Sequence, residues 1–276
     1  MQKILVTGAT GFIGKYVIDE LVKHNIEIFS VQRSTKSEKI LNKRVHVIET
    51  NDLFSESIEW WETKCKGIDI VLHLAWFTKS REYLDSYENI HCLTGSLNLA
   101  RAAVLAGVKR FIGIGTCVEY DLTYQTLSVD TPLKPLSIYA ASKAGLFLNL
   151  TQFFKTYSVD FTWCRIFYVY GDSDDKNRFI PFLKSKLDLN EEVNLPNGEQ
   201  IRDFLNVTEV ARIISETTLS TKTGPINVCS GIPKSIQQIA IQVADQYQKR
   251  DLIKFDKNID KLDSHPFIVG VPNYET

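Results

Sequence analysis

A tyrosine and a lysine stand four positions apart in the stretch SIYAASKAG, residues 137–145. On a helix, side chains at this spacing project from the same face, so Tyr139 and Lys143 would lie one above the other. The ammonium group of Lys143 is expected to lower the pKa of Tyr139 from its usual value of about 10. Such a phenol can exchange a proton with a hydroxyl or ketone near neutral pH. The alternative is an exposed tyrosine and a solvated lysine, because the spacing is common by chance.

A glycine-rich turn near the N-terminus predicts a bound dinucleotide. The motif GATGFIG, residues 8–14, lies between an apolar segment and a segment with helical periodicity. Glycines at a strand-to-helix junction let the backbone approach a pyrophosphate, whose charge the helix N-terminus stabilises. A tight turn without a ligand is the alternative, and the surrounding strand and helix argue against it. The residues expected to contact the cofactor here are Gly8, Gly11, Phe12, Ile13 and Gly14.

The end of the second expected strand, residues 27–32, is predicted to select the cofactor. An acidic residue about 20 positions beyond the glycines would bind the ribose 2′-hydroxyl of NAD, whereas a basic residue suits the 2′-phosphate of NADP. The chain has Gln32 at the expected acidic position, followed by Arg33 and Lys36. NADP(H) is therefore the preferred cofactor and NAD(H) the alternative, in which Arg33 would be a solvated loop charge. Asp52 and Leu53 follow the third expected strand and are expected near the adenine, although Asp52 could equally cap a helix.

The rest of the chain supplies the scaffold for these groups. Segments rich in β-branched and aromatic residues alternate with segments of helical periodicity, which predicts parallel strands joined by helical crossovers. The predicted fold is α/β: a Rossmann-type doubly wound parallel sheet over residues 1–165, with a smaller α/β C-terminal substrate lobe over residues 166–276. The expected strands are 3–8, 27–32, 44–49, 69–75, 110–115, 160–171, 200–206 and 225–229, and the expected helices include 54–66, 83–106, 137–157, 177–188, 208–219 and 235–249.

Composition narrows the class of partner. The 32 basic and 33 acidic residues give a formal net charge of −1, which favours a small-molecule partner over nucleic acid or an anionic membrane. The five cysteines are widely spaced and include no CxxC, which argues against a disulfide framework and against a zinc site. No metal site is expected. The N-terminus begins a strand almost at once and no apolar run approaches eighteen residues, so a cytoplasmic protein is expected.

These motifs together resemble the extended short-chain dehydrogenase/reductase family, in its NAD-dependent epimerase/dehydratase branch. The resemblance rests on TGATGFIG (7–14), HLAW (73–76), GTCVEY (115–120), YAASK (139–143), RIFYVYG (165–171) and RDFLNVTEVA (202–211). It implies that Thr116, Tyr139 and Lys143 are catalytic, with Tyr139 exchanging the proton and Lys143 holding the nicotinamide ribose. Further cofactor contacts implied are Leu74, Ala75, Trp76 and Phe167.

Departures from the family pattern narrow the choice among the reactions that the family catalyses. Dehydratases of the family carry an Asp-Glu pair after the catalytic threonine, where this chain has Cys117 and Val118, so dehydration is not expected. Glu119 lies one position later and is expected to be structural or to orient substrate. Tyr168 replaces the usual asparagine that contacts the substrate's phosphates. Arg202 is then the expected diphosphate ligand, with a salt bridge to Asp203 as its alternative role, because a guanidinium chelates phosphate.

Two enzymatic interpretations remain open. In the first, NADPH reduces the C4 ketone of a nucleotide-linked 4-keto-6-deoxyhexose, as in the small ketoreductases that finish deoxysugars for bacterial surface polysaccharides. In the second, tightly bound NAD serves a nucleotide-sugar 4-epimerase. A non-catalytic NADP-sensing protein is a third interpretation, which has no need of a proton relay. Thr78, Cys117, Tyr168 and Arg202 are the expected substrate contacts, and a homodimer through a four-helix bundle of helices 83–106 and 137–157 is expected.

Overall fold

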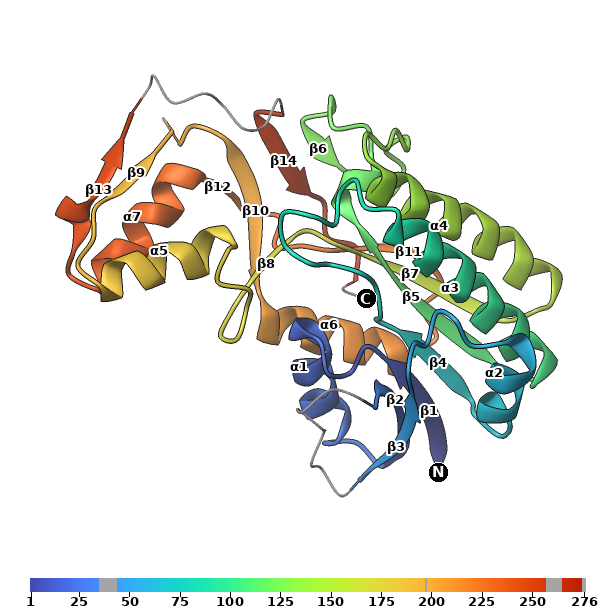
Figure 1. Cartoon of the computed structure of the whole chain (residues 1–276). Coiled ribbons are helices and arrows are strands. Elements are labelled where there is room, and N and C mark those ends of the chain that lie inside the picture. Colours follow the sequence, from blue (N-terminus) through green and yellow to red (C-terminus); the bar gives the residue numbers. More distant parts are fainter. Residues whose placement is uncertain (35–43, 197, 257–264, 275–276) are drawn as a thin grey trace.

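The larger part of the molecule is built on a seven-stranded parallel sheet (Figure 1). The structure is a computed structural model that describes residues 1–34, 44–196, 198–256 and 265–274. The strand order is β11-β7-β5-β4-β1-β2-β3. The strands are β1 (Gln2–Thr7), β2 (Ile26–Arg33), β3 (Val45–Thr50), β4 (Ile70–His73), β5 (Arg110–Thr116), β7 (Asp160–Ile166) and β11 (Gly224–Val228). The order reverses between β1 and β4, and ligands of doubly wound sheets bind at the carboxyl ends of such neighbouring strands.

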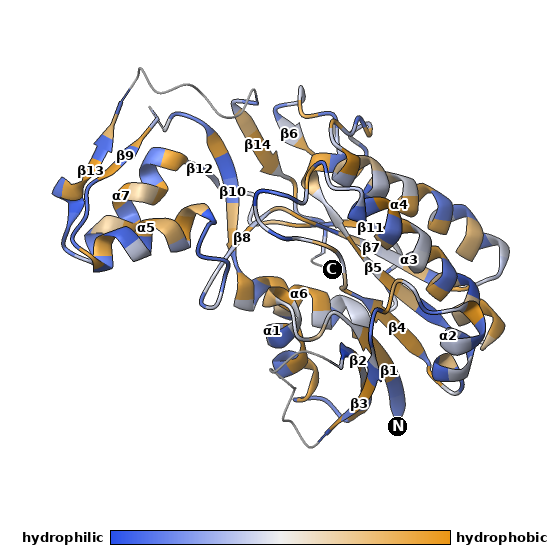
Figure 2. Ribbon diagram, viewed as in Figure 1, coloured by the Kyte–Doolittle hydropathy of each residue, from blue (hydrophilic) through white to orange (hydrophobic). Residues whose placement is uncertain are grey.

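Two layers of helices cover the sheet. Helices α1 (Phe12–Leu21) and α6 (Val207–Leu219) pack together on one face, and α2 (Ile58–Cys65), α3 (Glu88–Leu105) and α4 (Ile138–Thr156) lie on the other (Figure 1). Ile4 and Val6 of β1 belong to the core beneath the first layer, whereas Leu5 belongs to the core beneath the second. Alternate residues of a strand point to opposite faces, so a strand buried on both sides must be apolar throughout. In Figure 2 β4 is mostly hydrophobic, with Ile70, Val71 and Leu72 before its last residue His73, while the helices carry both kinds of residue.

The C-terminal part of the chain builds a smaller lobe with its own core. Helices α5 (Phe179–Asp188) and α7 (Ile236–Gln246) pack on the paired strands β9 (Val193–Leu195) and β13 (Ile253–Phe255). A second sheet joins this lobe to the large sheet, with β10 (Ile201–Asn206) pairing with β8 (Tyr168–Tyr170), β12 (Pro233–Ser235) and β14 (Phe267–Gly270). Strand β14 also pairs with β6 (Thr126–Leu127), and two short 3-10 helices, η1 (Cys117–Glu119) and η2 (Arg250–Leu252), complete the elements.

The structure confirms the Rossmann-type α/β fold and corrects several boundaries. The strand expected over 160–171 breaks at Phe167, so that β7 stays in the large sheet while β8 pairs with β10. Helix α2 begins at Ile58 and is capped by the Ser57 side chain, which accepts a hydrogen bond from the Trp60 amide. Asp52 is therefore not the helix cap. The division into two domains between residues 165 and 166 stays a prediction. Two elements beyond it belong with the large sheet: α6 packs against one face, and β11 is a strand at its edge.

Two further features bear on the expected class of protein. Within the described ranges, no helix combines the length and apolar character needed to cross a membrane. The five cysteines are all buried free thiols.

Candidate active site

One cavity of about 880 Å³ opens at the carboxyl ends of β1, β4 and β5, between the large sheet and the smaller lobe. Its walls include every residue that the sequence predicts for the cofactor, the substrate and the chemistry. These are Gly8, Gly11, Phe12, Ile13, Gly14, Arg33, Asp52, Leu53, Leu74, Ala75, Trp76, Thr78, Thr116, Cys117, Tyr139, Lys143, Phe167, Tyr168 and Arg202. The fold thus brings the predicted residues together, while their individual roles stay predictions.

The glycine turn packs directly against the end of β4. Gly8 has a φ of +74°, and a β-carbon there would lie 2.6 Å from the backbone nitrogen of Ala75. A β-carbon on Gly14 would lie 2.1 Å from the carbonyl oxygen of Gly8. Gly11 is the N-cap of α1, so the first amides of that helix are available to an anion at the cavity. The turn, the helix end and the adjoining cavity fit the pyrophosphate of a dinucleotide.

The end of β2 meets the same cavity at the predicted adenosine side. Gln32 is buried and donates a hydrogen bond to the Ser30 hydroxyl, whereas Arg33 is exposed at the cavity wall. Neither side chain is anionic, so neither would repel a 2′-phosphate. Lys36 lies outside the described residues. The carboxylate of Asp52 accepts hydrogen bonds from the Phe54 amide, from Ser55 and from His91, whose Nε2 lies 2.7 Å away, and these bonds lower the pKa of Asp52.

Tyr139 stands at the start of α4, where its amide donates a hydrogen bond to the Leu84 carbonyl. The Tyr83 ring meets the Tyr139 ring edge-on, with centroids 4.9 Å apart. Burial raises the pKa of the Tyr139 phenol, the neighbouring Tyr83 adds to this, and a hydrogen bond with the Thr116 side chain opposes it. The expectation of a lowered pKa at Tyr139 is therefore wrong. Desolvation outweighs the opposing effect of Thr116, so the phenol is neutral at pH 7.

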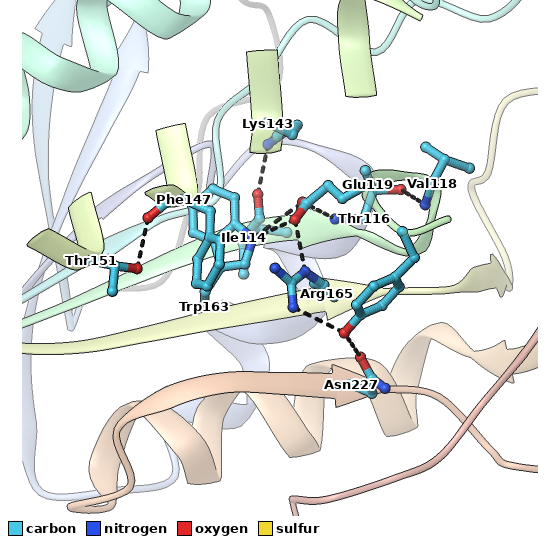
Figure 3. Close-up of polar contacts among 11 residues, drawn as sticks. Ile114, Thr116, Val118, Glu119, Lys143, Phe147, Thr151, Trp163, Arg165 and Asn227 are labelled. Carbon is cyan, nitrogen blue, oxygen red and sulfur yellow. Dashed lines mark hydrogen bonds and ion pairs between the residues drawn. The ribbon is translucent and has the colours of Figure 1, made fainter. Parts of the chain in front are cut away.

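Lys143 lies one helical turn beyond Tyr139 and is almost completely buried. Its Nζ donates a hydrogen bond of 2.7 Å to the carbonyl oxygen of Ile114 (Figure 3) and lies 3.8 Å from the centre of the Trp76 ring. Burial lowers the pKa of Lys143 to about 7, while the negative charge of Glu119 opposes the shift. The solvated surface lysine, which was the alternative interpretation, is thereby excluded.

The predicted substrate residues line the opposite part of the cavity, towards the smaller lobe. Arg202 is buried and donates hydrogen bonds to the carbonyls of Ile201 and His265, with its guanidinium 5.6 Å from the centre of the Tyr168 ring. The neighbouring Asp203 carboxylate accepts hydrogen bonds from the Ser230 and Gly231 amides. Cys117 is buried beside Thr116, and burial raises the pKa of its thiol to about 12, so it is not a proton shuttle near neutral pH.

Sequence reasoning missed several residues of this cavity. Arg178, from the segment before α5, lines it and lies 3.5 Å from the buried Asp174 carboxylate. Phe204 lines the cavity from β10, and Gln200 lines it from the segment directly before β10. Phe204 lies within the motif RDFLNVTEVA, which gave it no role, and Arg178 and Gln200 belong to no motif, so only the packing of the smaller lobe on the sheet reveals them. Among the residues that the structure describes, no three His, Cys, Asp or Glu side chains gather as a metal site requires.

Comparison with known proteins identifies the family. The profile of the NAD dependent epimerase/dehydratase family matches residues 4–229. The chain belongs to this family. The predicted resemblance is thereby confirmed, and the homologues are nucleotide-sugar dehydrogenases, dehydratases and epimerases of the extended short-chain dehydrogenase/reductase type.

Individual relatives carry several different activities. The chain is 28% identical to the dTDP-6-deoxy-L-talose 4-dehydrogenase (NAD(+)) of Aggregatibacter actinomycetemcomitans, across 86% of this chain and 87% of that protein. It is 25% identical to the CDP-abequose synthase of Salmonella typhimurium, across 76% and 67%. Its fold matches that of the UDP-N-acetylglucosamine 4-epimerase of Methanobrevibacter ruminantium M1, solved with UDP-N-acetylmuramic acid, with a TM-score of 0.87, 25% identity and coverage of 98% and 89%.

Proposed function

We propose that the protein reduces the C4 ketone of a nucleotide-linked 4-keto-6-deoxyhexose, using NADPH. The observation that carries the proposal is the meeting of Thr116, Tyr139 and Lys143 in the cavity that the glycine turn also borders. A dinucleotide site and a proton donor on one cavity are what reduction of a ketone requires. The dehydrogenase and synthase relatives, whose names specify dTDP- and CDP-linked sugars, support this class of substrate.

The protonation state of Tyr139 favours the reductive direction. When bound, the nicotinamide supplies the hydride that adds to C4. Tyr139 is a neutral phenol at pH 7, because burial raises its pKa, and it donates its proton to the C4 oxygen as negative charge develops there. Thr116 orients the phenol by a hydrogen bond and stabilises the phenolate that remains. The Lys143 ammonium adds electrostatic stabilisation and holds the nicotinamide ribose.

The side chains beside Thr116 argue against dehydration. Removal of water needs an acid and a base next to the catalytic threonine, and Cys117 and Val118 occupy those positions. The Cys117 thiol stays protonated because burial raises its pKa to about 12, and valine carries no proton. Besides the hydride that the cofactor would supply, reduction needs only the one proton that Tyr139 delivers.

NADP(H) is the proposed cofactor. Arg33 at the cavity wall offers a cation to a 2′-phosphate, and the buried Gln32 replaces the carboxylate that would bind the 2′-hydroxyl of NAD. The dehydrogenase relative is named for NAD(+), which makes NAD(H) the alternative cofactor. Dissociation constants for NADPH and NADH test it directly, and a clear preference for NADH would reject the assignment.

Incubation of the enzyme with NADPH and dTDP-, CDP- or GDP-linked 4-keto-6-deoxyhexoses tests the reaction. Oxidation of NADPH that depends on the sugar is expected, together with a product carrying a C4 hydroxyl. The matched control is Tyr139→Phe, which preserves the ring and removes the proton. The absence of NADPH oxidation with every one of these sugars would reject the reductase.

The match to a 4-epimerase structure favours a second candidate, a nucleotide-sugar 4-epimerase that retains NAD. An epimerase would be purified with NAD bound and would interconvert two sugars at C4 without net oxidation of added NADPH. Analysis of the cofactor released from the denatured protein distinguishes the two candidates, since a reductase exchanges its cofactor with solution at each turnover.

We also propose a homodimer through α3 and α4. Leu148 of α4 and Ile90 and Leu105 of α3 are exposed apolar side chains. Two copies that paired these helices would form a four-helix bundle and remove such side chains from water.

A further inference from the structure

A buried ion pair lies directly behind the proposed catalytic residues. Glu119, the last residue of η1, is inaccessible to solvent, and so is almost all of Arg165 on β7. The Arg165 Nε donates to Glu119 Oε2 at 2.7 Å (Figure 3). The Trp163 indole nitrogen donates to both carboxylate oxygens at 3.1 Å. Burying an ion pair costs free energy unless its hydrogen bonds are satisfied, and even then it often adds little stability. We therefore looked to the neighbouring catalytic residues for the role of this pair.

The strand beside the pair is shaped to admit it. Gly113 and Gly115 lie within β5. Glycine in the interior of a strand weakens the strand and often marks a site that another group approaches closely. A β-carbon on Gly115 would lie 2.4 Å from Glu119 Oε1 and 2.2 Å from the Trp163 indole nitrogen. A β-carbon on Gly113 would lie 2.5 Å from the Trp163 ring. These glycines therefore make room for the carboxylate and for the indole that binds it.

The carboxylate reaches Thr116 by a reciprocal hydrogen-bonding arrangement. Glu119 Oε1 accepts a 2.8 Å hydrogen bond from the Thr116 amide, while the Thr116 hydroxyl accepts one of 3.5 Å from the Val118 amide. Thr116 and Glu119 together form the capping box of η1, in which each side chain accepts from the other's backbone. These contacts fix the backbone and side chain of Thr116, whose side chain lowers the pKa of the neighbouring Tyr139 phenol.

The same carboxylate acts on Lys143 through space. The Lys143 Nζ is tied to Ile114 of β5 and lies 6.0 Å from the centre of the Trp163 ring, the ring whose indole nitrogen binds Glu119. The titratable groups that face Lys143 are Glu119 from η1, Cys92 from α3 and His73 from β4. Burial lowers the pKa of His73 to about 3 and raises that of Cys92 to about 11, so both are neutral at pH 7. Glu119 is thus the negative charge that faces the ammonium group.

We propose that Glu119 is a positioning residue with two effects: it fixes Thr116 beside Tyr139, and it holds a negative charge behind the Trp163 ring, on the side of the Lys143 ammonium group. Arg165 holds the carboxylate in place, and its guanidinium donates onward to the Tyr120 hydroxyl, which in turn donates to Asn227 of β11. The proposal rests on the proposed function for its catalytic consequence. Its electrostatic part concerns the ligand-free protein and is tested without any substrate.

The direct test is the titration of Lys143 by NMR of lysine labelled with ¹³C at Cε, with the signal assigned by its loss in Lys143→Met. In Glu119→Gln the midpoint should fall by about one pH unit, since a nearby opposite charge shifts a pKa by about that amount or more. The matched control is Asp203→Asn, which removes another fully buried carboxylate and should leave the Lys143 midpoint where it is. An unchanged midpoint in Glu119→Gln would overturn the proposal.

The catalytic test is the pH dependence of kcat/KM with NADPH and a 4-keto sugar. The alkaline limb should move to lower pH in Glu119→Gln by the shift that NMR reports, and kcat should fall about tenfold or more because Thr116 is no longer held. A purely structural role would lower stability and leave the limb unmoved. If Glu119→Gln does not fold because Arg165 is left unpaired, the double variant Glu119→Gln/Arg165→Met removes both charges and must show shifts in the same direction, smaller because the positive charge of Arg165 is removed as well. Should the wild type reduce no sugar, the proposed function fails while the NMR result still decides the electrostatic part.

Discussion

Lys143→Met should stabilise the protein at neutral and acidic pH while removing its activity. Lys143 is about 3% exposed, and burial lowers its pKa from 10.5 to about 7. This shift corresponds to a penalty of about 5 kcal/mol for holding the ammonium group inside the folded protein. Methionine fills a similar volume without charge but forfeits the hydrogen bond to Ile114, which costs about 1–3 kcal/mol. The net gain expected at pH 6 is therefore about 2–4 kcal/mol.

The pH dependence of this gain is more diagnostic than its size. Below pH 7 the lysine is charged in both the folded and unfolded chains, so the penalty is complete. Between pH 7 and 10.5 the folded protein releases the proton and the unfolded chain retains it, so the wild type gains stability at about 1.4 kcal/mol per pH unit. Above 10.5 neither state is charged and the penalty is absent. The advantage of Lys143→Met should therefore decline steadily as the pH rises through this window.

Urea unfolding followed by tryptophan fluorescence, on both proteins at several values from pH 6 to about pH 10, measures this difference. Other titrating groups cancel in the comparison of variant with wild type. Lys155→Met is the matched control, because Lys155 is exposed on the same helix and its loss should change stability by less than about 1 kcal/mol at every pH. A variant less stable than wild type at pH 6, or a difference that does not vary with pH, would refute the reasoning.

Four other variants test the cofactor site, helix α4 and the assembly. Arg33→Ala should weaken NADPH binding about tenfold or more and leave NADH binding unchanged, as isothermal titration would show, and equal losses for both would contradict the 2′-phosphate contact. Gly8→Ala should lose cofactor binding and about 2 kcal/mol or more of stability, because its β-carbon meets Ala75 at a φ of +74°. Gly145→Ala, on α4 where nothing lies within 4 Å, should instead stabilise by about 0.5–1 kcal/mol in thermal unfolding. Leu148→Glu should convert the proposed dimer into a monomer in light scattering, and a wild type that is already monomeric at all concentrations would exclude that dimer.

The parts of the fold that depend on short-range pattern could be predicted from the sequence. The strand, glycine turn and helix at residues 3–21 follow from apolar periodicity and from the conformational freedom that Gly8 needs. The pairing of Tyr139 with Lys143 follows from helical spacing alone. The boundaries that failed were set by tertiary contacts. Strand β8, for example, leaves the direction of β7 because it pairs with β10, more than thirty residues further along the chain.

The electrostatics of the site could not be predicted from spacing. The sequence places a lysine near Tyr139 and so suggests a lowered pKa for the phenol, whereas burial decides the outcome and raises it. The Glu119–Arg165 pair joins residues from η1 and β7, which become neighbours only when β7 pairs with β5. One signal was present in the sequence: two glycines in the strand segment RFIGIG mark a place where another group approaches the backbone.

Hydride transfer in a single turnover, measured on enzyme preloaded with NADPH and mixed with a 4-keto sugar, tests most directly whether Tyr139 is the proton donor. In Tyr139→Phe the dissociation constant for NADPH should be unchanged, while the rate of cofactor oxidation should fall by about 10²–10⁴-fold. A variant that oxidises NADPH at the wild-type rate would contradict the assignment of Tyr139.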